Sequence, residues 1–451
     1  MNLPRIHPSK QLLVVVGITV IILFVIDLYS TSSGSLGIVG IDSLGRLSWI
    51  VIVTLSALML IDFGVSRKSP ITGVTRQITK YLSLGRVAIV RLGIQHSSYR
   101  EVDISLIDHV PTLLEVDANP IHLVLMPGHM VNVEYEVRAI GRGSGQFMKT
   151  EFSIPSRFGL WKFIHQFECQ TAIKVYPDFI AISGYTLLAT DNHISHLGIL
   201  QKPRRGQGTE FQQLREYRQG DPLRQIDWKA TSRVNKLISK DYQDERDQNI
   251  ILMIDNGRRL RAKDDELSHF DHALNALLLL AYVALKQGDS VGMMSFGADS
   301  RWLPPMKGVN NINVLLNHFY DLYAGNESSD YLQAVSDLAQ RQKKRSLIVM
   351  VSNLRDEDTD DLITAAKLLR KRHLLMVANI REPVLDKMQK NVVEDFDSAM
   401  DYLSSSYYLE QRKKVTEFCV SQGVFTIDCL PKHLGVRVIN SYTAMKRAGY
   451  L

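Results

Sequence analysis

Two long apolar runs lie near the start of the chain. Gln11 to Tyr29 is apolar except for Asp27, and Leu47 to Val65 is apolar except for Asp62. At about 1.5 Å of helical rise per residue, each run comes close to the roughly 30 Å hydrocarbon core of a membrane. Both aspartates stand near the end of a run, where a charge reaches the headgroups. The pattern predicts a transmembrane hairpin in residues 1–66, with helices at about 11–29 and 47–65.

Basic residues set the expected orientation of this hairpin. Arg5 and Lys10 precede the first run, and Arg46 is the one basic residue between the runs. Five more follow the second run: Arg67, Lys68, Arg76, Lys80 and Arg86. The positive-inside rule then predicts an inner (plasma) membrane protein whose N-terminus and soluble domains are cytoplasmic. A cleaved signal peptide is the alternative for the first run, but no small-residue cleavage site stands before the second apolar stretch.

Residues 80–180 change to short runs that alternate apolar and polar positions. Val87 to Leu92, His122 to Met126 and Val131 to Val137 are examples, and Gly and Pro residues separate them. Strands divided by turn signals predict a small β-sandwich-like domain. No group of His, Cys or carboxylate residues in this segment suggests chemistry.

Residues 249–451 alternate short apolar strands with amphipathic helical stretches. The expected strands are Ile250 to Ile254, Val291 to Phe296, Leu347 to Val351, Leu374 to Ala378 and Val424 to Ile427. Near-continuous apolar strands with helical crossovers predict a Rossmann-like α/β domain, with a parallel sheet covered on both faces. Ligands of such sheets bind at the carboxyl ends of the strands, and Asp255 has that position on the first strand.

Composition narrows the possible functions. The chain has 451 residues, of which 45% are hydrophobic and 22% charged, as in a folded protein of two or three domains. The 53 basic and 47 acidic residues are intermixed, which argues against a nucleic-acid partner. The three cysteines have no metal-ligand spacing and are expected to be reduced thiols.

A charged connector, residues 200–248, joins the two soluble domains. Phe211, Leu214, Tyr217, Ile226 and Trp228 interrupt its charges regularly, so the segment is expected to pack on a surface rather than to act as a solvated linker. Asp221 and Asp227 would form an acid–base pair in the alternative interpretation, an active site in this connector.

The connector also carries a resemblance. Gly208-Thr-Glu-Phe, Leu214-Arg-Glu-Tyr, Gly220-Asp and Ile226-Asp-Trp-Lys-Ala resemble the signature of the domain-of-unknown-function 58 family. Upstream, Gly141-Arg-Gly, Phe158-Gly-Leu-Trp and Val175-Tyr-Pro extend the likeness. The motif positions expected to serve interaction are Glu210, Phe211, Arg215, Tyr217, Gly220, Asp221, Arg224, Asp227, Trp228, Lys229 and Arg233. The resemblance implies a bacterial or archaeal membrane-anchored protein that works with a MoxR-type AAA+ ATPase in the maturation of other proteins.

The C-terminal half resembles von Willebrand factor A domains, whose first strand ends in an Asp-x-Ser-x-Ser motif that helps to hold Mg²⁺. Here the motif reads Asp255-Asn-Gly257-Arg-Arg259. The remaining weak oxygen ligands would be Asp255, Ser328, Ser329 and Asn353. Mg²⁺ needs near-octahedral oxygen ligation, so binding is expected to be poor and no cofactor is assigned. Gly257 and Arg259 are expected to line a crevice for a protein partner.

These observations favour a membrane-anchored adaptor with no assigned catalytic residue. The chain lacks a Gly-x-x-x-x-Gly-Lys-[Ser/Thr] loop, so ATP hydrolysis would belong to the partner. A hydrolase that uses the carboxylates Asp221, Asp227 or Asp255 is the first alternative, although the chain has neither a Gly-x-Ser-x-Gly nor a His-Glu-x-x-His motif. A structural envelope protein is the second alternative.

Overall fold

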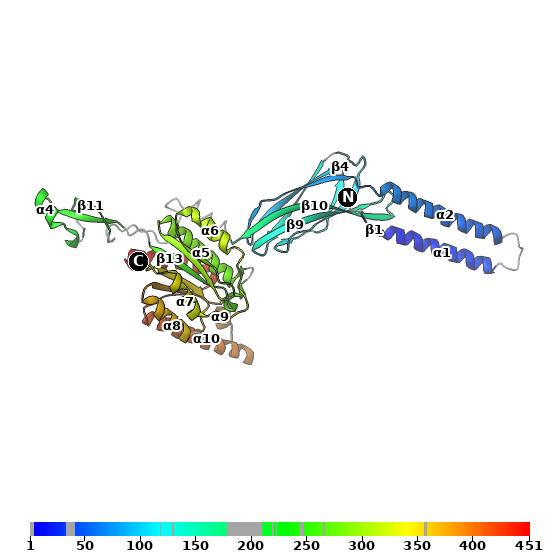
Figure 1. Cartoon of the computed structure of the whole chain (residues 1–451). Coiled ribbons are helices and arrows are strands. Elements are labelled where there is room, and N and C mark those ends of the chain that lie inside the picture. Colours follow the sequence, from blue (N-terminus) through cyan, green and yellow to red (C-terminus); the bar gives the residue numbers. More distant parts are fainter. Residues whose placement is uncertain are drawn as a thin grey trace. The chain divides into compact units, whose positions relative to one another are not determined.

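The chain divides into two compact units, Met1–Val175 and Tyr176–Leu451 (Figure 1). The computed structural model describes residues 4–32, 41–117, 119–128, 130–177, 210–218, 221, 223–243, 248–264, 267–355 and 359–451.

Two helices begin the N-terminal unit, α1 (Lys10–Ser32) and α2 (Ile41–Ser66), and they run side by side (Figure 1). Within α2, the segment Trp49–Ser66 has a mean hydropathy of 2.0, and its side chains are almost entirely exposed. The end of α2 is tied to the turn at residues 156–160, because buried Asp62 accepts hydrogen bonds from Ser156 Oγ at 2.6 Å and from the Phe158 amide at 3.1 Å.

Two antiparallel sheets make up the rest of the N-terminal unit. The strands are β1 (Arg5–Pro8), β2 (Ile71–Gln77), β3 (Tyr81–Ser83), β4 (Val87–His96), β5 (Val102–Asp108), β6 (Leu114–Val116), β7 (Ile121–Leu125), β8 (Met130–Ala139), β9 (Gly143–Pro155) and β10 (Trp161–Tyr176). One sheet has the order β1-β10-β9-β5-β7, with β3 beside β10, and the other has the order β2-β4-β8-β6. Alternate residues point inward, as a strand requires, so Val90, Leu92 and Ile94 of β4 are fully buried.

The C-terminal unit begins with a hairpin module, defined as the described residues of 210–243. Its strands β11 (Glu210–Glu216) and β12 (Ile238–Gln243) pair antiparallel in a sheet of their own. Between them lie a short 3-10 turn, Leu223–Gln225, and the helix α4 (Trp228–Val234).

An α/β domain forms the rest of this unit. Its sheet has the order β17-β16-β13-β18-β19-β20, where the strands are β13 (Asn249–Asp255), β16 (Ser290–Phe296), β17 (Trp302–Lys307), β18 (Leu347–Ser352), β19 (Leu374–Ile380) and β20 (Phe425–Cys429). The helices are α5 (His269–Lys286), α6 (Ile312–Phe319), α7 (Tyr331–Arg341), α8 (Thr359–Arg370), α9 (Pro383–Lys390), α10 (Phe396–Ser421) and α11 (Leu434–Arg447). A short ribbon, β14 (Lys263–Asp264) and β15 (Leu267–Ser268), precedes α5.

Each face of this sheet has its own apolar core. Ile250, Leu252 and Ile254 pack in a cluster with residues of α5, α6 and α11. Ile251 and Met253, which point the other way, pack in a cluster with residues of α7, α8 and α10. A strand buried on both faces needs apolar residues at every position, which explains the continuous run in β13.

The fold class predicted from the sequence is wrong about the sheet of the α/β domain and about the number of transmembrane helices. The sheet of the α/β domain is mixed rather than parallel, because β17 pairs antiparallel with β16, and antiparallel pairs also build the sheets of the N-terminal unit and of the hairpin module. Only a short connection, Gly297–Arg301, separates these two strands, so no helical crossover can intervene. This strand is not predicted from the sequence, because Trp302-Leu-Pro-Pro-Met-Lys contains two prolines and proline is rare in strands other than those at sheet edges.

The predicted pair of transmembrane helices is also corrected. Among the described residues, one helical segment, Trp49–Ser66, is long and apolar enough to cross a membrane. The apolar part of α1, Lys10–Val25, falls in the shorter class of 10–17 residues.

Candidate functional site

Asp255 ends β13 at the carboxyl edge of the sheet, and its side chain is fully buried. Its carboxylate accepts hydrogen bonds from three donors. The Gly257 amide donates to Oδ1 at 2.8 Å, Ser329 Oγ donates to the same oxygen, and Ser352 Oγ donates to Oδ2 at 2.5 Å. Through these bonds, Asp255 joins the segment before α7 and the end of β18 to the end of β13.

Arg259 and Tyr331 extend the hydrogen-bond network around Asp255. The Tyr331 hydroxyl is 2.9 Å from Ser352 Oγ, and Arg259 Nη1 donates to that hydroxyl at 3.3 Å. The guanidinium carbon of Arg259 also lies 5.4 Å from the centre of the Tyr331 ring. Gly257 and Arg259, the two residues expected to line a crevice, are both buried in packed protein. A Cβ on Gly257 would lie 2.2 Å from Ser329 Oγ.

The four predicted oxygen ligands do not all meet. Ser329 bonds to Asp255, but its neighbour Ser328 is exposed. Asn353 is buried elsewhere, where its Nδ2 donates to Glu382 and its Oδ1 accepts from Arg412 Nη1 at 2.8 Å. Sequence reasoning missed Ser352, although it stands beside Asn353 and ends a strand that pairs with β13.

This set of donors fits Mg²⁺ poorly. The ion prefers six oxygen ligands in near-octahedral geometry, whereas this site has one carboxylate that already accepts hydrogen bonds from protein donors. The buried Arg259 cation lies in the same network through Tyr331. In the part of the chain that the structure describes, no three His, Cys, Asp or Glu side chains come together to hold a metal.

The hairpin module uses its aspartates for its own structure. Arg215 holds Asp221 with two hydrogen bonds, Nη1 to Oδ2 at 2.7 Å and Nη2 to Oδ1 at 2.9 Å. The Arg218 amide donates to the same carboxylate at 2.9 Å. The Arg215 side chain is the main cause that lowers the pKa of Asp221 to about 2. This carboxylate is therefore ionised at neutral pH and locked in an ion pair.

Asp227 caps α4. Its Oδ1 accepts from the amides of Lys229 and Ala230, both at 3.0 Å, and the Ala230 bond is the main cause that lowers the pKa of Asp227. Lys240 Nζ lies 3.4 Å from Oδ2. Asp221 and Asp227 thus belong to two separate hydrogen-bond sets, which is not the arrangement of an acid–base pair.

The remaining signature positions surround this frame. Tyr217 donates through its amide to Leu237 O at 2.8 Å, and through its hydroxyl to Asp221 O at 3.3 Å. The backbone of Glu210 and Phe211 pairs with β12. Gly220 lies outside the described residues. Three cations, Arg224, Lys229 and Arg233, are exposed.

Apolar side chains of the hairpin module point to solvent. Leu223 is 72% exposed, Trp228 68% and Val234 57%. Within the module, Ile226 and Ile238 are buried at 8% each, so this small unit has few apolar residues inside and several outside. Tryptophan and arginine are among the residues that are enriched at protein interfaces.

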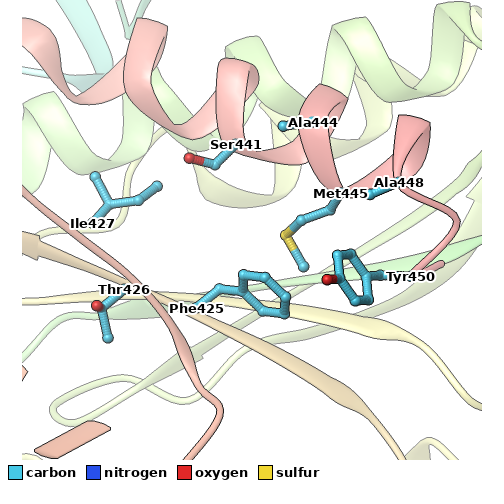
Figure 2. Close-up of a pocket in the computed structure, with 8 residues that line it drawn as sticks. All are labelled: Phe425, Thr426, Ile427, Ser441, Ala444, Met445, Ala448 and Tyr450. Atoms are coloured by element: carbon cyan, nitrogen blue, oxygen red, sulfur yellow. The ribbon is translucent and has the colours of Figure 1, made fainter. Parts of the chain in front are cut away.

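A pocket of about 270 Å³ lies between the edge strand β20 and α11. Figure 2 shows its lining, with Phe425 and Ile427 from the strand and Met445 from the helix. The rings of Phe425 and Tyr450 lie 5.4 Å apart at its end. Its residues are apolar or carry hydroxyls, so the pocket offers shape and apolar contact rather than groups for acid–base chemistry.

The protein thus has an α/β domain, an added hairpin module and a helix long and apolar enough to cross a membrane. The carboxylates of Asp221, Asp227 and Asp255 are all held by hydrogen bonds within the protein. Residues 213–405 match the model of a family described as protein of unknown function DUF58. The chain is also similar to the uncharacterized protein YeaD of Bacillus subtilis (strain 168), with 20% identity over 265 residues. That match covers 58% of this chain and 63% of YeaD.

Solved structures resemble a smaller part of the chain. The native alpha-2-macroglobulin of Escherichia coli is 20% identical over 24% of this chain and 7% of its own length, with a TM-score of 0.19. The FixG-related protein from Vibrio parahaemolyticus is 10% identical over 24% of this chain and 98% of its own, with a TM-score of 0.18. Each of these similarities is confined to about a quarter of the chain.

Proposed function

We propose that this protein is a membrane-anchored adaptor that works with a MoxR-type AAA+ ATPase in the assembly or maturation of other proteins. The observation that carries the proposal is the hairpin module. Its signature aspartates are used inside the module, while Leu223, Trp228 and Val234 are left exposed. We infer that these exposed apolar side chains contact a partner.

The exposed residues of the module are of the types that dominate binding energy. Tryptophan and arginine are enriched among the residues whose truncation costs most at protein interfaces. Trp228 begins α4, and the exposed cation Lys229 follows it directly. If the ATPase binds the hairpin module here, the Trp228 side chain would insert into the partner, and basic residues such as Lys229 would lie around that contact.

The segment Trp49–Ser66 supports the membrane anchor. Arg67 and Lys68 follow it immediately, so the positive-inside rule favours a cytoplasmic location for the domains that come after it. This is the compartment where an ATPase partner would have ATP.

The alternative of a hydrolase has less support. A general base works best with a pKa near the operating pH, and the pKa of Asp221 is about 2. Asp227 is occupied as a helix cap, and Asp255 is fully buried. The pKa values of Asp221 and Asp227 are lowered rather than raised, and Asp255 is not accessible to a substrate.

The test is a binding titration between the full chain in lipid nanodiscs and a purified MoxR-type ATPase from the same genome, with and without ATP. Trp228→Ser is expected to weaken binding by about thirtyfold or more, as for a central aromatic anchor. The matched control is Tyr99→Ser, since Tyr99 is 96% exposed but lies outside the module. Equal affinity of the wild type and Trp228→Ser for the ATPase would overturn the assignment of the binding surface. If the wild type does not bind the ATPase with or without ATP, the proposed partner is wrong.

A further inference from the structure

A second unpartnered surface lies on the first half of α10. Phe396, Met400, Leu403 and Tyr407 are spaced by four, three and four residues, which places them on one face of the helix. Their side chains are 78%, 48%, 61% and 64% exposed. We call these four residues the α10 stripe.

The α10 stripe faces away from the side by which the helix is held. The buried residues of α10 are Ser405, Arg412, Val415 and Cys419. At about 100° of turn per residue, they lie roughly on the opposite side of the helix from the stripe. The stripe is therefore an additional apolar face, not the edge of the core.

The helix is well fixed at both ends of this surface. Asp395 and Ser398 form a capping box at its start. Farther along, Arg412 Nη2 donates to Ile380 O at 2.6 Å and to Asp428 Oδ1 at 2.9 Å. Gln389 of α9 also donates to Ser406 Oγ at 3.3 Å. A rigid helix loses little conformational entropy when a partner binds.

The charge around the stripe says what kind of partner fits. Residues 391–409 contain four acidic residues, namely Glu394, Asp395, Asp397 and Asp401, and no lysine or arginine. The chain as a whole has a net charge of +6, whereas this segment has a net charge of −4. Complementary charge steers partners and rejects wrong ones.

From this geometry we propose that the α10 stripe docks an amphipathic helix of another protein, whose apolar face is bordered by lysine and arginine. The stripe spans about three helical turns, or roughly 17 Å, which suits a helix laid along it. Ala399 and Ser404 are small residues beside the stripe, and they let a second helix approach closely. This inference stands apart from the hairpin module and from the identity of the ATPase.

The same charges argue against two other occupants. A second copy of this chain that used its own α10 stripe would bring two acidic segments together, and like charges at an interface are repulsive. A membrane surface that carries anionic lipids would likewise repel four carboxylates. The basic helix is the occupant that satisfies both the apolar stripe and its charge.

The experiment measures binding of two labelled amphipathic peptides of equal length to the full chain in zwitterionic nanodiscs. One peptide carries lysine beside its leucine face, and the other carries glutamate at the same positions. The lysine peptide is expected to bind at least about tenfold more tightly, with protection of residues 396–407 from hydrogen exchange. Equal affinity of the two peptides, or no protection of the stripe, would overturn the proposal.

Variants separate the stripe from nonspecific effects. Leu403→Ser is expected to weaken the lysine peptide about tenfold or more, whereas Val420→Ser leaves it unchanged. Val420 is the matched control because it is 55% exposed on α10 but lies off the stripe. Asp397→Lys with Asp401→Lys should reverse the preference toward the glutamate peptide. If sedimentation instead shows self-association that Leu403→Ser abolishes, the occupant is a second copy and the proposal fails.

Discussion

Asp255 keeps a carboxylate inside the C-terminal unit because protein donors replace the water that the group would otherwise bind. A backbone amide and two serine hydroxyls supply those donors. Burial of an ionised carboxylate without such partners is very costly. The contact also requires a glycine two residues later, since the backbone of residue 257 passes directly against Ser329 and Glu327.

Gly257→Ala is expected to destabilise the α/β domain by about 1–3 kcal/mol, because the new methyl group has no room. Its Cβ would lie 2.2 Å from Ser329 Oγ and 2.8 Å from Glu327 O. Hydrogen exchange of the β13 amides gives the free energy of opening. Gly435→Ala is the control, since a Cβ there meets its nearest atom at an ordinary 3.5 Å. An equal effect of both variants would contradict the close contact at Gly257.

Asp221 gives the hairpin module a defined response to acid. Its pKa is about 2 in the folded module, against an ordinary 3.8, chiefly because of Arg215. Because the folded pKa is the lower one, the stabilisation is fully present above about pH 3.8 and is lost as the pH falls through about 2. Carbon-detected NMR of the Asp221 carboxyl is expected to titrate near 2 in the wild type and nearer its ordinary value in Arg215→Gln. An unchanged midpoint in the variant would contradict the ion pair.

At the scale of elements, Arg412 fastens α10 to the carboxyl end of the sheet. Its guanidinium donates to Asn353 Oδ1, to the carbonyls of Leu354 and Ile380, and to Asp428. One side chain thus joins the ends of three strands to a helix that is otherwise largely exposed. Val415 and Cys419 of the same helix add apolar contacts to this face of the sheet.

Arg412→Met is expected to cost the α/β domain about 3 kcal/mol, since it leaves buried acceptors without a donor. The loss should appear as faster hydrogen exchange in α10 and at the end of β19. Lys413→Met provides the comparison, because Lys413 is the next residue and its side chain is 76% exposed. If the two variants exchange alike, Arg412 does not anchor the helix.

The central strands of the α/β domain can be predicted from the sequence because a short, continuous apolar run between turn signals is typical of a strand buried on both faces. The runs at Val291–Phe296 and Leu347–Val351 lie in the strands β16 and β18. The strand β17 escapes such a prediction, since Pro304 and Pro305 stand within it. A local sequence pattern also does not show which strands pair with each other. Here β17 follows β16 after a short connection and pairs with it antiparallel, so the sheet is mixed rather than parallel.

The candidate sites can be predicted only in part. Asp255 and Ser329 come together as expected, but Ser352 acts as a hydrogen-bond donor that the motif comparison does not indicate. Ser352 ends β18 and Tyr331 begins α7, and both elements are far in the sequence from β13, which carries Asp255. In the connector, the motif marks Asp221 and Asp227 as important, yet only their hydrogen-bond partners show that both are structural.

At the scale of the whole molecule, α2 is the element suited to hold the chain at a membrane. The segment Trp49–Ser66 exposes mostly apolar side chains, and its last turns bond through Asp62 to the turn between β9 and β10. The carboxylate of Asp62, near the end of α2, is therefore hydrogen-bonded within the protein. This arrangement joins the membrane-type helix directly to a folded unit rather than through a loose tether.

Leu58→Asp is expected to release most of the chain from membranes, because a charge near the middle of a transmembrane helix costs about 2.5–3.5 kcal/mol. Extraction with alkaline carbonate measures the fraction that stays with the lipid. Leu58→Ala serves as the control because it shortens the side chain without adding charge. Retention of the aspartate variant at the wild-type level would mean that another part of the chain provides the anchor.

The closed hydrogen-bond set of Asp255 has a consequence for regulation. A domain that needs a cation to complete its binding face can be switched by the supply of that cation, and its partners then come and go with it. Here Ser329 and Ser352 donate hydrogen bonds to the carboxylate that would face such a cation. Removal of divalent cations by a chelator is therefore expected to leave the thermal unfolding of this domain and its affinity for a partner unchanged. The nucleotide cycle of the proposed ATPase partner, rather than a cation, would then determine when the two proteins bind.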